Sequence, residues 1–162
     1  MPHKITFMLI SLFVFLLIPI SPSHAQSSPQ VQEVSGTLDF PISQDIYAFT
    51  NANVGDTVYI WLEGDISIIP SARIYQSSEN FLAATINDFD TGVATLEWQV
   101  TEAGPLFLAV SDLYLSSSGN YRLLIGINEP TILDGSAVPT GDTILEFDPI
   151  ASANTEAACE SQ

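Results

Sequence analysis

The segment NDFD holds the densest group of metal-binding side chains in this sequence. It places Asn87, Asp88 and Asp90 within one predicted turn. Carboxylate and amide oxygens are the ligands that Ca²⁺ prefers, and the ion takes about six to eight of them. We therefore expect calcium as the one cofactor, although Asn and Asp also occur in ordinary acidic turns for their backbone geometry. Further ligands would have to come from other turns, and the candidates are Asp39, Asp45 and Asp112.

Two aromatic side chains form a second candidate site. In the segment TVYIWLEG, Tyr59 and Trp61 lie on the opposite side of a predicted strand from Val58, Ile60 and Leu62. Aromatic rings side by side on a flat sheet can stack on sugar rings or on Pro-rich polypeptide. The alternative is that a loop or the C-terminal segment covers both rings. The pair predicts contact with a neutral polysaccharide or a protein surface.

Most catalytic chemistries are excluded once an N-terminal leader is removed. Both histidines, His3 and His24, and the only lysine, Lys4, lie before Ala25. Nucleophilic triads then lose their general base, and Schiff-base chemistry loses its amine. The single cysteine, Cys159, is too little for a zinc site of the His/Cys kind. Paired carboxylates could still hydrolyse glycosides, but a small domain without large insertions offers little cleft, and we predict that the chain is not an enzyme.

Asp45 opens the segment DIYAF, in which Tyr47 and Phe49 share one face of a strand. A carboxylate at the start of a strand can accept backbone N–H bonds of the preceding turn. We therefore interpret Asp45 as structural rather than catalytic. The two rings are expected to enter the same layer of the core.

The N-terminal residues have the layout of a secretion signal. Lys4 precedes the apolar run ITFMLISLFVFLLIPI, and SPSHA ends in small residues suited to cleavage near Ala25. The run is shorter than the roughly 20 residues of a membrane-spanning helix, and Pro19 and Pro22 interrupt its end. We predict secretion to the periplasm or the extracellular space, with residues 1–25 as the signal peptide and no stable membrane anchor.

Cleavage leaves a strongly acidic chain. The 162 residues include 19 Asp and Glu against three Lys and Arg, and the formal net charge of −16 becomes −17 without Lys4. Such a surface repels phosphate backbones and anionic lipids, which are bound by clustered Lys and Arg. Nucleic acid is therefore excluded as a partner, whereas cations, neutral polysaccharides and proteins remain. The oligomeric state stays open, since Cys159 could link two chains.

Hydrophobic alternation indicates an all-β domain from Val31 to Ile127. Turn signals such as Gly55-Asp56 and Gly104-Pro105 separate the alternating runs. About eight strands are predicted, at residues 31–38, 45–50, 57–63, 72–76, 81–86, 93–100, 105–111 and 120–127. Alternation of this kind is typical of antiparallel sheets with one wet face, and two such sheets give a jelly-roll-like β-sandwich.

The chain changes character after Asn128. Pro, Gly and small polar residues become frequent, with one credible strand at residues 143–147. We expect the β-sandwich domain to occupy residues 26–128. Residues 129–162 are expected to form a linker or edge strand with a disordered acidic tail.

A family resemblance is carried by six segments in order: VSGTL, DIYAF, NVGDTVYIWLEG, SARIYQSSENFLAATIND, AGPLFLAVSD and SGNYRLLIGI. Together they resemble bacterial pre-peptidase C-terminal domains over about residues 31–127. The resemblance implies a compact β-sandwich, similar in fold to the collagen-binding modules of collagenases, that serves exported enzymes as a noncatalytic accessory domain. No protease segment precedes these residues in the sequence, which favours a free-standing binder.

The residues and the resemblance lead to the same expectation about function. We expect a secreted, noncatalytic accessory or binding module that contacts a neutral polymer or a protein surface through Tyr59 and Trp61. The alternative is a structural module or escort for a larger exported protein such as a protease, with no ligand of its own.

Overall fold

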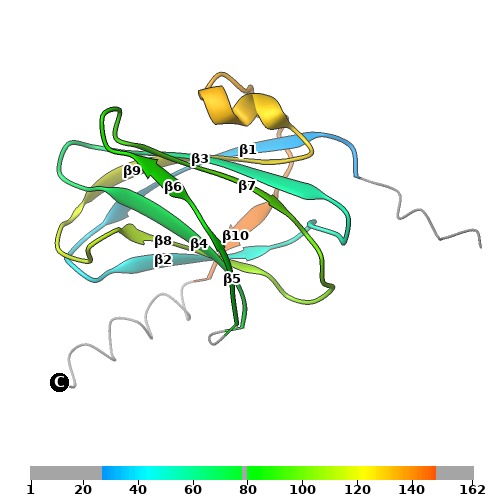
Figure 1. The fold of residues 1–162 in the computed structure, drawn as a ribbon, viewed down its shortest axis with the longest axis horizontal. Coiled ribbons are helices and arrows are strands. Elements are labelled where there is room, and N and C mark those ends of the chain that lie inside the picture. Colours follow the sequence, from blue (N-terminus) through cyan, green and yellow to red (C-terminus); the bar gives the residue numbers. More distant parts are fainter. Residues whose placement is uncertain (1–26, 78–79, 149–162) are drawn as a thin grey trace, which may run out of the picture.

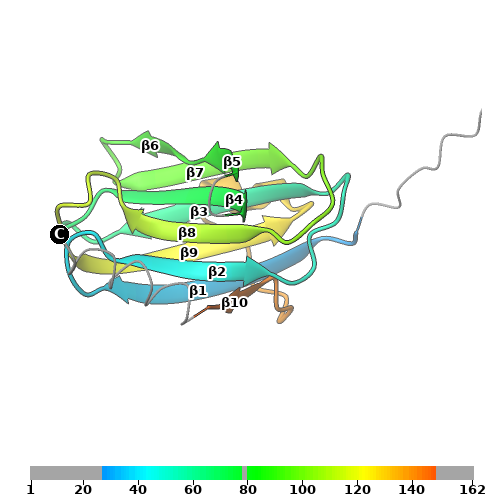
Figure 2. The same ribbon diagram turned by 90° about the horizontal axis from the view of Figure 1, so that it is seen from below.

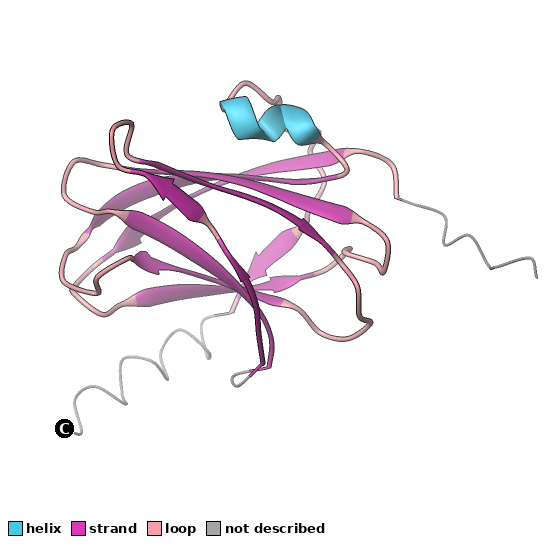
Figure 3. Ribbon diagram, viewed as in Figure 1, coloured by secondary structure: helices cyan, strands magenta, loops and turns pink. Residues whose placement is uncertain are grey.

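The computed structural model describes residues 27–77 and 80–148. The predicted signal peptide, the cysteine and the predicted acidic tail beyond residue 148 lie outside the described residues. Two layers of β-strands make up the described part, with one short 3-10 helix above them (Figures 1 and 3). No helix among the described residues is long and apolar enough to cross a membrane.

The strands form two antiparallel sheets of five strands each. Sheet A has the order β1 (Gln30–Leu38), β9 (Gly119–Ile127), β3 (Thr57–Gly64), β7 (Val93–Gln99) and β6 (Ile86–Asp88). Sheet B has the order β10 (Leu145–Phe147), β2 (Gln44–Phe49), β8 (Phe107–Asp112), β4 (Pro70–Ser77) and β5 (Asn80–Ala84). Most successive strands lie in opposite sheets, and the exceptions are the neighbouring pairs β4–β5 and β6–β7. The strand order is that of a jelly roll, and the predicted all-β sandwich is confirmed.

One predicted strand is divided between the two sheets. The predicted range 81–86 corresponds to β5 in sheet B and to the start of β6 in sheet A. The chain turns this corner at Thr85, which is buried. Its backbone N–H donates to the carbonyl of Ala72 (2.9 Å), and its hydroxyl oxygen accepts from the Ala72 N–H (3.0 Å). These bonds replace the ladder that is interrupted where the strand changes sheets.

The core lies between the sheets and follows the predicted alternation. On β3, Val58, Ile60 and Leu62 are fully buried, as expected from their period of two. Each such side chain contributes about 1.5 to 3 kcal/mol on burial. On β9, Tyr121 and every second residue to Ile127 are buried on the same side.

A second, smaller apolar cluster lies on the outer face of sheet A. Leu124 projects away from the main core and is still fully buried, together with Val31. The 3-10 helix η1 (Pro130–Asp134) covers them with Ile132. Gly126 permits this contact, because any side chain at that position would overlap Ile132.

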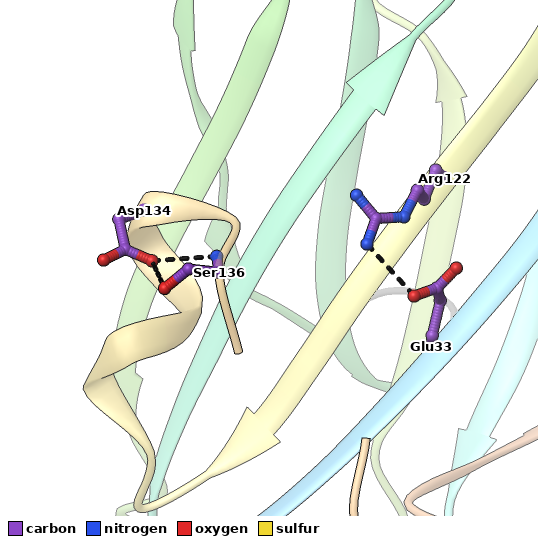
Figure 4. A network of polar contacts seen from close by, with 4 residues as sticks. All are labelled: Glu33, Arg122, Asp134 and Ser136. Carbon is purple, nitrogen blue, oxygen red and sulfur yellow. Dashed lines mark hydrogen bonds and ion pairs between the residues drawn. The ribbon is translucent and has the colours of Figure 1, made fainter. Parts of the chain in front are cut away.

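The ends of η1 are closed by local hydrogen bonds. The Glu129 side chain caps its start by accepting from the N–H of Thr131 (3.3 Å). Asp134 accepts from the N–H of Ser136 (2.8 Å) beyond its end, as Figure 4 shows. Gly135 takes a left-handed backbone at φ 74°, which a glycine adopts without strain.

The segment after η1 completes the open edge of sheet B. Strand β10 pairs with β2, and the side-chain oxygen of Gln32 accepts from the N–H groups of Ile144 and Leu145 (2.7 Å each). Residues 130–147 therefore pack against both sheets. Figure 2 shows β10 beside β1 and β2 at one side of the sandwich.

Candidate functional site

A shallow pocket of about 530 Å³ lies on the outer face of sheet A. Its polar lining consists of Ser35, Thr37, Glu63, Asp65, Asn120 and Arg122. These side chains come from β1, β3 and β9 and from the loop that follows β3. The pocket therefore sits where three neighbouring strands approach one end of the sheet.

The strand register explains why these polar groups converge. Ser35 and Arg122 are paired across β1 and β9, and Thr37 is paired with Asn120. Glu63 is paired with Arg122 across β3 and β9. Directly opposed residues on one face of a sheet bring their side chains together. The Thr37 hydroxyl donates to the side-chain oxygen of Asn120 (2.8 Å), which fixes the Asn120 amide.

Arg122 stands at the centre of this face. Its guanidinium donates to Glu33 (3.0 Å) and lies over the ring of Trp61, 5.2 Å from the centroid. The hydrogen bond to Glu33 raises the pKa of Arg122, and the same bond lowers the pKa of Glu33. An exposed ion pair of this kind contributes at most about 1 kcal/mol to stability. Its main consequence is that the guanidinium is held in place at the pocket, and Figure 4 shows its bond to Glu33.

The predicted aromatic pair lies along β3 on the same face. Reading from η1 towards the pocket, the outer positions are Tyr59, Trp61 and Glu63. Trp61 is half-buried between the Arg122 guanidinium and Gly135, where an added β-carbon would lie 2.9 Å from the indole. Tyr59 is also half-buried and packs against the cluster under η1. Burial, followed by the charge of Glu97, raises its pKa. Trp61 is thus close to the pocket, and Tyr59 belongs to the covered part of the face.

Asp65 holds the rim of the pocket in place. Its carboxylate accepts from the backbone N–H of Asn120 (2.8 Å) and from the N–H of Ser67 (2.9 Å). These backbone hydrogen bonds lower its pKa. The Asn120 amide also donates to Asp65 (3.2 Å). The loop after β3 is therefore fastened to the start of β9.

The residues predicted to bind calcium lie at the edge of sheet A. The Asn87 amide donates to the carbonyl of Pro70 (2.5 Å), and Asp88 accepts from the N–H of Asp90 (3.0 Å). Hydrogen bonding to the Asp90 N–H lowers the pKa of exposed Asp88. Within residues 27–77 and 80–148, no group of three or more His, Cys, Asp or Glu side chains is placed to hold a metal ion. Calcium binding at Asn87, Asp88 and Asp90 stays a prediction from the sequence.

Asp45 reaches into the sandwich. Its carboxylate accepts from the hydroxyl of Tyr121 (2.5 Å), and the Tyr121 and Tyr47 hydroxyls are bonded to each other (2.5 Å). Burial raises the pKa of both phenols. The contact joins β2 of one sheet to β9 of the other. The sequence did not indicate that Asp45 would accept a hydrogen bond from Tyr121.

The sequence did not single out most of the residues that line the pocket. Ser35, Thr37 and Asn120 are isolated small polar residues, far apart along the chain. Their shared position follows only from the pairing of β1 with β9. Alternation along the two strands shows only that these residues face outward. Which of them lie next to each other follows only when the strand register is known.

Comparisons with known proteins yield likenesses of fold. No family model and no curated protein matches the chain. One similar structure is the pre-peptidase C-terminal domain of collagenase from Bacillus anthracis. It is 16% identical, with 59% of this chain and 89% of that chain covered at a TM-score of 0.49. Another is Aeromonas hydrophila PliG, a periplasmic lysozyme inhibitor of g-type lysozyme, at 12% identity, with 60% and 86% covered and a TM-score of 0.48.

Proposed function

We propose that this chain is a secreted, noncatalytic binding module whose pocket on sheet A holds a neutral sugar unit of a polysaccharide. The observation that carries the proposal is the convergence of hydroxyl, amide, carboxylate and guanidinium groups in one open pocket beside Trp61. The pocket is shallow, which suits a length of polymer lying across the sheet better than an enclosed small molecule.

The hydrogen-bonding groups of the pocket match those of a sugar. The Ser35 hydroxyl can donate and accept, and the Thr37 hydroxyl can accept while it donates to Asn120. Glu63 accepts, and Arg122 donates. Sugar hydroxyls likewise donate and accept, so each can find a partner here. Glu63 and Asp65 make the pocket unfavourable for phosphate, sulfate or carboxylate groups. Because these carboxylates repel anions, we infer that the ligand is neutral.

The apolar contribution comes from the Trp61–Arg122 stack. Arg122 lies on the indole, so the ligand would meet the guanidinium and the exposed part of the ring together. A pre-organised side chain loses little conformational entropy when a ligand binds. Glu33 on one side and Gly135 on the other hold this stack in place.

The same pocket is poorly suited to glycoside hydrolysis. A glycosidase needs one carboxylic acid whose pKa is raised, so that it can protonate the leaving group. The pKa of Asp65 is lowered by its backbone hydrogen bonds, so it stays ionised. Asp65 is therefore suited to accept hydrogen bonds from a ligand and not to protonate a leaving group.

Retention of the mature chain on insoluble cellulose, chitin and starch tests the proposal. We expect native protein to be retained on at least one of these polymers. Arg122→Gln should reduce retention about tenfold, since it removes the charged donors of the pocket. Arg73→Gln is the matched control, because it removes the other arginine of the mature chain from sheet B.

The outcome is decided by comparing these variants. Lost retention for Arg122→Gln with unchanged retention for Arg73→Gln supports the pocket. Equal retention of all three proteins would place the ligand elsewhere. Absence of native binding to every polymer would refute the proposed ligand class.

A further inference from the structure

Four loops gather at one end of the sandwich. The register aligns the ends of β1 and β3 with the starts of β9 and β7 in sheet A, and the starts of β2 and β4 with the end of β8 in sheet B. The connecting loops therefore emerge together, at the left of Figure 2. We call this surface the loop end, and it consists of residues 39–43, 65–69, 89–92 and 113–118.

Every one of these loops exposes a large apolar side chain. The residues, with their exposed fractions, are Phe40 (41%), Ile42 (39%), Ile66 (106%), Phe89 (65%) and Tyr114 (65%). A single exposed apolar side chain is ordinary, but a group on four adjacent loops indicates an interaction surface. The two loops that connect the sheets at the opposite end, residues 50–56 and 100–106, expose none.

The backbone of the loop end is ordered by carboxylates. Asp112 is 3% exposed and accepts from the N–H of Ile69 (2.9 Å) and from the N–H of Ser116 (3.0 Å), which ties two loops together. Asp65 similarly ties the loop after β3 to β9. The apolar tips therefore project from loops that are already held in shape. Such pre-organisation reduces the entropy that binding must overcome.

The backbone conformation of Ile42 is strained, so this residue destabilises the isolated chain. Its φ of 71° is in the left-handed region, where a β-branched residue is strained. Glycine or asparagine would fit this backbone better and would not place an aliphatic side chain in water. Strain of this kind is found where a surface is shaped for binding.

The charge of the loop end restricts its partner. Asp39 and Asp90 are exposed within these same loops, and the four loops contain no Lys or Arg. A second copy of the chain would bring carboxylates against carboxylates. A lipid surface would have to accept these carboxylates near its apolar region, and anionic lipids would repel them.

We propose that the loop end docks onto a partner protein whose surface presents apolar side chains bordered by Lys and Arg. The apolar tips supply the buried contact, and Asp39 and Asp90 pair with the basic border. This surface borders the pocket on sheet A and shares Asp65 with its rim, but its apolar tips lie outside the pocket lining and do not depend on a sugar ligand.

A random-peptide library panned against the immobilised mature chain tests the proposal. We expect the selected peptides to combine aromatic or aliphatic residues with Lys or Arg. The loop-end variant Ile66→Ser/Phe89→Ser/Tyr114→Ser should bind them at least about tenfold more weakly, because it removes three central anchors. Their binding should also weaken as salt is raised.

The matched control variant is Phe81→Ser/Ile86→Ser/Val138→Ser, which removes three exposed apolar side chains outside the loop end. It should bind the peptides like native protein. Ile66→Ser alone should weaken binding without changing the urea midpoint, since this side chain is fully exposed. The single variant keeps the test valid if the triple variant folds poorly.

Four results would overturn the proposal. The selected peptides could lack basic residues, or they could bind the loop-end and control variants equally. The native chain could form a dimer that the loop-end variant abolishes, so that the surface serves self-association. Finally, neutral phosphatidylcholine vesicles could retain the native chain and not the loop-end variant, so that the surface contacts lipid.

Discussion

Each end of the sandwich has a buried aspartate that holds its loops, but the two ends differ in the side chains that they expose. At the loop end, buried Asp112 accepts backbone N–H groups of two loops. At the opposite end, buried Asp56 accepts from the N–H of Ser27 (2.8 Å), the N–H of Asn53 (3.0 Å) and the Asn128 amide (2.9 Å). Both ends are thus ordered by a carboxylate, but the loops at residues 50–56 and 100–106 expose no large apolar side chain, whereas all four loops of the loop end do.

This difference shows that holding the loops in shape and exposing apolar side chains are distinct properties of the molecule. Asp56 ties the segment before β1 and the segment after β9 to the loop before β3. Its loops are polar, so order there serves stability alone. The loops at the Asp112 end are also held by a carboxylate and in addition carry apolar side chains that are 39% to 106% exposed. We therefore expect substitutions that change the stability of the fold without changing the exposed apolar surface, and others that do the reverse.

The largest effect is expected at Asp56. Replacing it with alanine leaves several buried donors without an acceptor, and we expect unfolding to become easier by about 3 kcal/mol. Urea denaturation followed by tryptophan fluorescence measures this loss. Asp90→Ala, which removes an exposed carboxylate, should change stability by less than about 0.5 kcal/mol.

Asp112→Ala sharpens this comparison. It also loses buried acceptors, but Asp56 serves additional donors through Ser27 and Asn128. We therefore rank Asp56→Ala as the more destabilising change. An Asp112→Ala variant that is less stable than Asp56→Ala would show that the loop end, and not the opposite end, is the main support of the fold.

A smaller effect is expected from acid. Burial acts to raise the pKa of Asp56 and of Asp112, but their several hydrogen bonds outweigh it, and both pKa values are lowered on folding. A lowered folded-state pKa stabilises the fold at pH values above the ordinary aspartate pKa near 4. This contribution is lost as the pH falls through the folded-state pKa.

Thermal unfolding from pH 6 down to pH 2 measures the acid effect. The melting temperature should fall steeply below about pH 4. In the double variant Asp56→Asn/Asp112→Asn this fall should be shallower, because amides do not titrate. A double variant with the native pH profile would assign the acid sensitivity to other carboxylates.

The sequence predicts the fold well because its strands carry a local signal. Alternation in β3 placed Val58, Ile60 and Leu62 on one face, and the structure buries all three in the main core. The second apolar cluster was missed because Leu124 stands in the outward phase of β9, where a polar residue is expected. Its cover, η1, is too short to show helical periodicity.

The candidate surfaces were far less predictable. Tyr59 and Trp61 were correctly assigned to the outer phase of β3, but their contacts with η1 and Arg122 depend on long-range packing. The loop end joins residues from four separate loops, so no segment of the sequence contains it. Only the jelly-roll topology, which brings alternate connections to one end, places these tips together.

The smallest effect, and the sharpest test of the comparison, is expected at Ile42. Replacing it with glycine relieves the left-handed strain but gives the unfolded chain more conformational freedom. Because a strained residue of this kind is unfavourable by about 1 to 3 kcal/mol, we expect a net gain of about 1 kcal/mol in unfolding free energy. Urea denaturation measures the gain. Glycine at Leu115, the second left-handed non-glycine position of the loop end at φ 54°, should gain less, because its side chain is partly buried and loses packing. A destabilised Ile42→Gly protein would mean that this side chain supports the fold, and the separation between order and display would then fail at this tip.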